Sequence, residues 1–167
     1  MSKAFTDEET AEAGPVVAPR APLPAGVPNY VTERGFEALR EELAGLDAER
    51  AAVEGVADER ARARQLAALA ERRAALESRI ASAEVVPPPT GPTDVVRFGA
   101  VVTVEGEGGR RRFQLVGVDE ADPARGKLAF VAPLARALVG RSLGDTVRLR
   151  APRGEEELEI VAVEYGA

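Results

Sequence analysis

The stretch FEALREELAGLDAERAAV (36–53) decides the fold, because its apolar side chains recur at helical spacing. The same pattern returns in LAALAERRAALESRIASA (66–83), after an interruption. Apolar residues that alternate three and four positions apart make a stripe along one helix face, and such stripes are buried when two helices pair. No proline lies between positions 30 and 86 to break either helix. The two segments therefore predict an antiparallel helical hairpin.

The two stripes also set the register of the hairpin. Placing Leu43 opposite Leu76 and Val53 opposite Leu66 aligns both stripes and puts the apex near residues 57–62. Each arm then has about 22–25 residues, so the rod extends about 33–38 Å at the rise of an α-helix.

Each stripe contains one arginine, Arg50 in the first and Arg73 in the second. Their long stems can cover the apolar seam while the charged ends reach water. We expect them to set the register or to limit further association of helices.

Composition excludes several kinds of function. The chain has no cysteine and no histidine, which removes disulfides, thiolate and imidazole metal ligands, and the commonest acid–base side chain. A net charge of −6 argues against a protein that mainly binds nucleic acid phosphates. Neither a run of the ~20 apolar residues that a membrane span needs nor a signal peptide is visible. We expect a cytoplasmic protein without a membrane segment.

The chain divides by composition into four segments. Residues 1–29 hold four acidic side chains and a proline-rich run, PVVAPRAPLPAGVPN, and we expect a disordered tail because little of it can be buried. A partner-binding peptide in polyproline conformation is the alternative. The hairpin covers residues 30–86, and a linker, 87–94, follows because its prolines cannot continue a helix. Residues 95–167 form a second domain.

The second domain is predicted to be a small, mostly antiparallel sheet with one short helix, which makes the fold class α+β. Valine-rich runs alternate apolar and polar residues, as half-buried strands do. GEGG (106–109) has the chemistry of a hairpin turn. PLARALVG (133–140) fits a helix with proline in its first turn and glycine at its end. The expected strands are FGAVVTV (98–104), RRRFQLVGV (110–118), KLAFV (127–131), DTVRLR (145–150) and EELEIVAVEY (156–165).

Several stretches resemble the Gre-type bacterial transcription factors. NYVTERGFEALREEL (29–43) is similar to the start of the first hairpin helix of that family, and the resemblance extends over about residues 29–165. It implies that the second domain is an FKBP-like sheet. The stretches that carry it in this domain, in the order and spacing of the family, are FGAVVTV (98–104), VGVDEAD (116–122), PLARALVGRSLGDTV (133–147) and EEELEIVAVEY (155–165).

The resemblance implies a mechanism. The sheet domain docks near the entrance of the secondary channel of bacterial RNA polymerase, and the hairpin enters the channel. Acidic residues at the tip help to hold a catalytic Mg²⁺ and its water, because this cation prefers oxygen ligands, and the polymerase itself cleaves the transcript. Asp58 and Glu59 are the candidate ligands, shared with the polymerase. On this mechanism, the chain itself is not an enzyme and binds no cofactor by itself. It is expected to be a monomer that contacts nucleic acid only within the transcription complex.

The tip departs from the pattern of the family, which reads Gly-Asp, two residues, Glu-Asn. Here the stretch reads EGVADERAR (54–62), so Gly55 and Glu59 match while Val56 takes the aspartate position and Asp58 is displaced. Each arm also looks one heptad short, about 10 Å of reach. We therefore expect occupation of the channel with weak cleavage or none. Alternatively, both carboxylates are solvated loop residues beside the arginines that follow.

Two further groups are candidates for contact with a partner. Pro133, Leu134 and Arg136 match the docking segment of the family, and the alternative is that they only start and pack a helix. Asp119 and Glu120 belong to an acidic turn that can bind a basic partner, cap a helix or solvate a loop.

Two other functions remain open at this point. The FKBP-like sheet suggests a folding helper or prolyl isomerase, although that activity needs a pocket lined with aromatic side chains and a fold alone supplies no site. Short-hairpin relatives described as nucleoside diphosphate kinase regulators are the other alternative.

Overall fold

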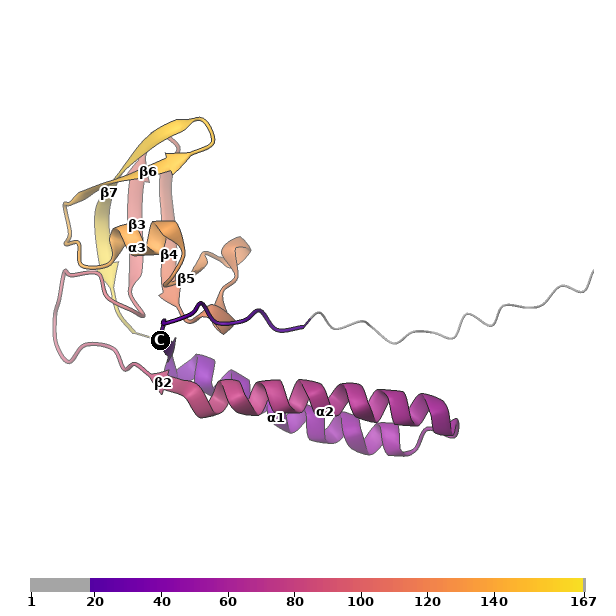
Figure 1. Ribbon diagram of the computed structural model, residues 1–167. Coiled ribbons are helices and arrows are strands. Elements are labelled where there is room, and N and C mark those ends of the chain that lie inside the picture. The colour runs from indigo at the N-terminus through magenta and orange to yellow at the C-terminus, as the bar shows by residue number, and fades with distance from the viewer. Residues whose placement is uncertain (1–18, 167) are drawn as a thin grey trace, which may run out of the picture.

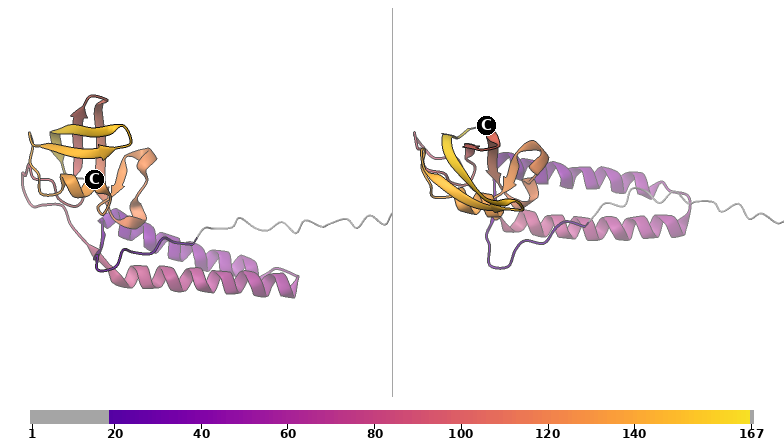
Figure 2. Two further views of the ribbon diagram at one scale, coloured as in Figure 1. Left: turned by 45° about the horizontal axis from the view of Figure 1, so that its top comes forward. Right: turned by 90° about the horizontal axis from the view of Figure 1, so that it is seen from above.

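The computed structural model describes residues 19–166 and divides them into a helical rod and a sheet domain (Figure 1). The rod consists of α1 (Glu33–Glu54) and α2 (Glu59–Ser82). Their lengths of 22 and 24 residues agree with the predicted arms and correspond to about 33 and 36 Å. Both views of Figure 2 show the rod projecting to one side of the sheet domain, to which only its base is joined. The α+β fold class is confirmed.

The start of α1 follows from a local cap. The hydroxyl of Thr32 accepts a hydrogen bond from the backbone N–H of Gly35 at 3.0 Å, which satisfies one of the amides left free in the first turn. The helix ends at Glu54, and residues 55–58 make the turn into α2. The turn thus overlaps only the first positions of the predicted apex.

The seam of the hairpin holds the predicted apolar residues. Fully buried positions alternate with half-buried ones along both helices, and the buried set is Leu39, Leu46, Val53, Leu69 and Leu76. The two arginines of the stripes lie at its edges: the Arg50 side chain is 63% exposed and pairs with Glu54 on its own helix. Arg73 crosses to Asp47 of α1. That bridge joins neighbours of the predicted register, so the arginines lie where the seam meets water.

A short parallel strand pair, which no pattern in the sequence predicts, closes the base of the hairpin. Strand β1 (Asn29–Val31) precedes α1, and β2 (Ala83–Val85) follows α2. In an antiparallel hairpin the chain enters and leaves at the same end, and β1 and β2 pair in register there. The side chain of Val31 is fully buried between the helices and this pair.

The sheet domain has five strands in the order β5-β4-β3-β7-β6. Neighbours are antiparallel except β4 and β5, which are parallel, and the predicted mostly antiparallel sheet is confirmed. The strands are β3 (Val101–Gly106), β4 (Gly109–Val116), β5 (Lys127–Ala129), β6 (Thr146–Ala151) and β7 (Gly154–Glu164). The short helices η1 (Val118–Glu120) and η2 (Pro123–Arg125) connect β4 to β5, and α3 (Pro133–Leu138) lies between β5 and β6.

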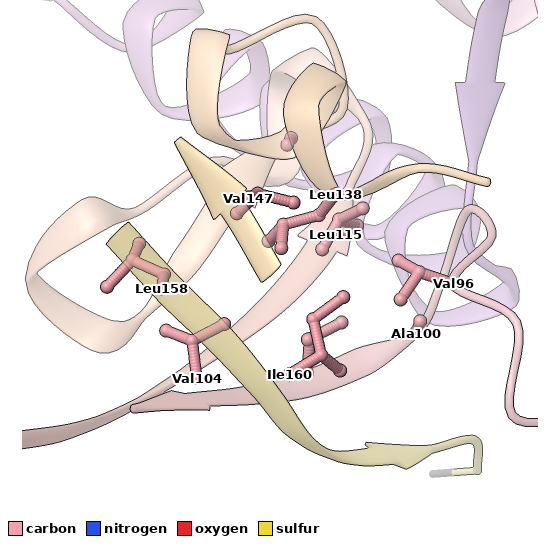
Figure 3. Close-up of a cluster of buried hydrophobic side chains, with 10 residues drawn as sticks. Val96, Ala100, Val104, Leu115, Leu138, Val147, Leu158 and Ile160 are labelled. Carbon is pink, nitrogen blue, oxygen red and sulfur yellow. The ribbon is translucent and has the colours of Figure 1, made fainter. Parts of the chain in front are cut away.

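The core of the sheet domain lies between α3 and the curled sheet (Figure 3). Leu138 of α3 is fully buried against strand residues such as Leu115, Leu158 and Ile160. Alternate strand residues point into this layer, as the period of two requires. The register between β3 and β7 shifts after Thr103, which adds a bulge and helps the sheet to curl.

The predicted disordered tail needs a correction. Residues 1–18 lie outside the described residues. Residues 19–28 run over the base of the hairpin with a turn at 24–27, and Asn29 already belongs to β1 (Figure 1). The segment has little to bury by itself, which predicts disorder. In the folded protein, buried charged groups at the base of the hairpin, Asp119 and Arg79, bind it and hold it in place.

Residues 86–94, by contrast, contain no helix or strand, and their role as a linker stays a prediction. Within residues 19–166, no helix combines the length and apolar character that a bilayer crossing demands.

Candidate functional site

The hairpin tip is held together by Asp58. Its Oδ1 accepts hydrogen bonds from the backbone N–H groups of Arg60 at 2.9 Å and Ala61 at 3.0 Å, so Asp58 is the N-cap of α2. These two backbone bonds, chiefly the one from Ala61, lower the pKa of the Asp58 carboxyl below its ordinary value. One carboxylate oxygen is therefore already engaged within the protein.

Glu59 and Arg62 make up the rest of the tip, and they differ in exposure. Glu59 is the first residue of α2 and is exposed to solvent, where its charge suits the N-terminus of a helix. The guanidinium of Arg62 folds back and donates to the carbonyl of Val56 at 2.9 Å, which fixes the turn.

The donor set at the tip fits Mg²⁺ only as a shared ion. Nowhere in residues 19–166 do three or more acidic side chains gather as a metal cage. Mg²⁺ takes about six oxygen ligands in a near-octahedral shell. Glu59 and the second oxygen of Asp58 would supply two of them, and a partner and water would have to supply the others. The tip can thus supply part of a metal site but does not form a complete one.

Helix α3 presents two of the three predicted docking residues to solvent. Pro133 and Arg136 are exposed and lie three positions apart, which places them on one face of the helix. Leu134 is half-buried and packs against the core, so it supports the helix from below. Two exposed aliphatic residues that the sequence analysis does not single out follow the helix: Val139, its C-cap, is 46% exposed, and Leu143, in the turn before β6, is 50% exposed. Exposed aliphatic side chains beside a charged residue are a common composition of a contact surface.

The two residues of the acidic turn lie in the joint between the hairpin and the sheet domain. Glu120 accepts hydrogen bonds from the Thr32 hydroxyl and from the backbone N–H groups of Thr32 at 3.0 Å and Gly117 at 3.1 Å. It therefore holds the start of α1 against η1. Thr32 thus has two roles: it caps α1, and it binds Glu120 of the sheet domain.

Asp119 is engaged in the same joint. Its side chain is only 6% exposed, and it contacts two arginines: Arg20 at 2.6 Å and Arg79, near the end of α2, at 3.4 Å. Both acidic residues are thus occupied by partners within the chain. Their predicted contact with a partner protein stays a prediction.

Three aromatic rings complete the joint. Tyr30 of β1 contacts Phe98 and Phe130 of the sheet domain, with ring centroids 5.8 and 5.5 Å apart, and the two phenylalanines contact each other at 5.5 Å. Packing of this kind stabilises an interface by more than its area alone. Phe98 and Phe130 are therefore used in the joint and do not line a binding pocket, which speaks against a prolyl isomerase site.

Comparison with known proteins supplies the context for this geometry. Residues 91–165 match the family described as transcription elongation factor, GreA/GreB, C-terminal. The transcription elongation factor GreA of Desulfovibrio desulfuricans is 37% identical over 150 residues, which are 81% of this chain and 93% of that protein. GreB of Neisseria meningitidis is 37% identical over 153 residues, 82% of this chain and 94% of that protein. The chain belongs to the GreA/GreB family.

A solved structure is similar over most of the chain as well. The crystal structure of GreA factor homolog 1 (Gfh1) of Thermus thermophilus is 24% identical, covers 83% of this chain and 99% of its own, and has a TM-score of 0.39. Membership in the GreA/GreB family confirms the expectation of a transcription elongation factor, and it agrees with the expectation that the chain is not itself an enzyme.

The sequence analysis missed the two arginines that bind Asp119 in the joint of this Gre-family protein. Arg20 and Arg79 are not among the predicted site residues, although both serve the joint. A usable signal was present for Arg79: it follows Leu76 by three positions, on the buried face of α2 near its end. No such periodicity exists for Arg20, because it precedes every helix.

Proposed function

We propose that this Gre-family protein docks on bacterial RNA polymerase through its sheet domain, residues 95–167, and places its hairpin, residues 30–86, in the secondary channel. There it modulates elongation sterically and stimulates transcript cleavage weakly or not at all. The observation that carries the proposal is the tip, where the carboxylate of Asp58 is engaged as a helix cap.

Two further features of the hairpin support steric action. Val56 stands where the family pattern has aspartate, which leaves Glu59 and the second oxygen of Asp58 to approach a shared Mg²⁺. The arms of 22 and 24 residues are, on our proposal, a short form of the family hairpin. A missing heptad shortens an arm by about 10 Å. A carboxylate must come within about 2 Å of Mg²⁺, so side-chain rotation cannot recover that distance.

Docking is assigned to the face of α3 that carries Pro133 and Arg136. An exposed arginine next to exposed aliphatic side chains can pair with a carboxylate of the polymerase while the apolar surface is buried. We expect the protein to act as a monomer at this surface.

The test is a transcript-cleavage and elongation assay on backtracked complexes of bacterial RNA polymerase. We expect an effect on elongation, little cleavage, and almost no change in either for Glu59→Ala. For Asp58 the informative variant is Asp58→Asn, because asparagine keeps the cap but removes the charge. Robust cleavage by the natural protein that disappears in Glu59→Ala or Asp58→Asn would show a working cleavage factor and overturn the proposal.

Docking is tested separately by competition for polymerase. We expect Arg136→Ala to weaken binding by about tenfold or more, as truncation of an interface arginine often does. Arg150→Ala, which removes an equally exposed arginine from β6, serves as the control and should bind as the natural protein does. Equal binding of both variants would contradict the assignment of the docking face.

A further inference from the structure

The segment 19–28 contacts both parts of the protein at once. The guanidinium of Arg20 donates from Nη1 to Asp119 of η1 at 2.6 Å, and from Nη2 to Glu42 of α1. Although burial works against the charge of Arg20, the two carboxylates outweigh it and raise the pKa of Arg20 above its ordinary value. One side chain of this segment therefore bridges the sheet domain and the hairpin.

The segment also completes a buried ion pair. The side chains of Asp119 and Arg79 are 6% and 8% exposed, but they approach each other only to 3.4 Å, and Oδ2 of Asp119 and Nη1 of Arg79 form no hydrogen bond within residues 19–166. Arg20 donates the hydrogen bond that Asp119 receives, and the Ala21 carbonyl accepts one from Nη2 of Arg79. Buried charges need such partners, because each has lost its water.

The polar contacts and the aromatic contacts of the joint do different work. The rings of Tyr30, Phe98 and Phe130 hold the two parts together, but the preference of a ring pair for one geometry is weak, so the contact tolerates a change of angle. Ion pairs with hydrogen bonds have a fixed geometry. Glu120 fixes the start of α1 at Thr32 in this way. Farther along the helices, the angle between rod and sheet is set by the network that contains Arg20, which reaches Glu42 and Arg79.

We propose that residues 19–28 are a strap that locks the hairpin at one angle to the sheet domain, with Arg20 as its latch. When the strap is released, Asp119 loses its hydrogen-bonded partner and the hairpin swings about the aromatic contact. This conformational device is independent of polymerase, because every contact that it needs lies within the chain.

The test measures the distance between the hairpin tip and the sheet domain. The chain has no cysteine, so Ala57→Cys in the tip and Glu107→Cys in the β3–β4 turn, both exposed, create one pair of spin-label sites in the full-length protein. Pulsed electron paramagnetic resonance then reports the distribution of the distance. We expect a narrow distribution for the otherwise unchanged protein, and a broader distribution or a second population for Arg20→Ala.

Two controls separate the strap from other effects. Arg40→Ala removes one exposed positive charge from α1 and should leave the distribution narrow. Deletion of residues 1–18 retains Arg20 and should also keep it narrow, whereas deletion of residues 1–24 should broaden it. Circular dichroism should show the same helix content in every variant.

The proposal fails if Arg20→Ala and the deletion of residues 1–24 both keep the narrow distribution. It also fails if Arg20→Ala lowers the helix content, because the segment would then support folding of the hairpin and would not set its angle.

Discussion

Truncation of Leu76 to alanine should open the hairpin without unfolding the sheet domain. The Leu76 side chain is 1% exposed and fills the seam of a two-helix rod, which has no second layer to take over its contacts. Loss of three carbon atoms removes about 2.4 kcal/mol at ~0.8 kcal/mol per methylene. The cavity raises the cost, and buried leucines span roughly 2–5 kcal/mol. Because two helices can partly collapse around the gap, we expect about 3 kcal/mol, which reduces the helix-pairing equilibrium by roughly 100-fold.

Thermal unfolding followed in two ways measures this effect. Circular dichroism should show early loss of helix in Leu76→Ala, while amide resonances of the strands, followed by NMR, should stay dispersed to a higher temperature. Leu43→Ala, a half-buried seam position, should cost less, and Leu143→Ala, a 50% exposed position of the sheet domain, should have little effect. If helix and sheet melt together in Leu76→Ala, the rod and the sheet domain are one cooperative unit and the division between them is refuted.

Two further predictions concern the ends of the helices. Gly35→Ala should lower the melting temperature even though alanine favours helices, because its Cβ would lie 2.1 Å from Cδ of Glu120 and break the contact of Glu120 with Thr32. Gly45→Ala is the control: it has open space around it and should stabilise α1 by up to about 1 kcal/mol. A higher melting temperature in both variants would contradict the close approach at Gly35. The cap at Asp58 should make the hairpin sensitive to acid. Because the pKa of the Asp58 carboxyl is lowered from the ordinary 3.8, the stability that the charged cap adds to the hairpin is present above that pH and is lost as the pH falls through the lowered pKa. The natural protein should therefore have more helix than Asp58→Ala above about pH 3.8, and the two curves of helix content against pH should converge as the Asp58 carboxyl is protonated at lower pH. Curves that coincide at every pH would argue against this role of Asp58.

Whether the role of a functional residue could be predicted depends on how far along the chain its partners lie. The role of Asp58 was within reach of the sequence, since an aspartate before a helical run is a typical N-cap and its partners are two and three positions away. The role of Asp119 was not, because one of its partners, Arg20, lies 99 positions away along the chain. Charged residues follow no periodicity that would reveal such a pairing.

Local patterns by themselves determined most of the architecture. The alternating apolar stripes predicted both helices and the apolar residues of the seam, and the valine-rich runs with their glycine turn predicted the strands β3 to β7. These features depend on neighbours within a few positions, so a period of 3.5 or of two in the sequence maps directly onto a buried face.

Only the tertiary structure decided how the two parts are joined. The β1–β2 pair, the aromatic contact of Tyr30 with Phe98, and the bridge from Arg20 to Asp119 all connect segments that are remote in the chain. Segment 19–28 has only two aliphatic side chains larger than alanine, Leu23 and Val27, which are too few for a core of its own. Its place is fixed because the folded joint offers it a buried carboxylate and a buried guanidinium. Such groups acquire their need for partners only after folding has removed their water, and no local pattern in the sequence records that need.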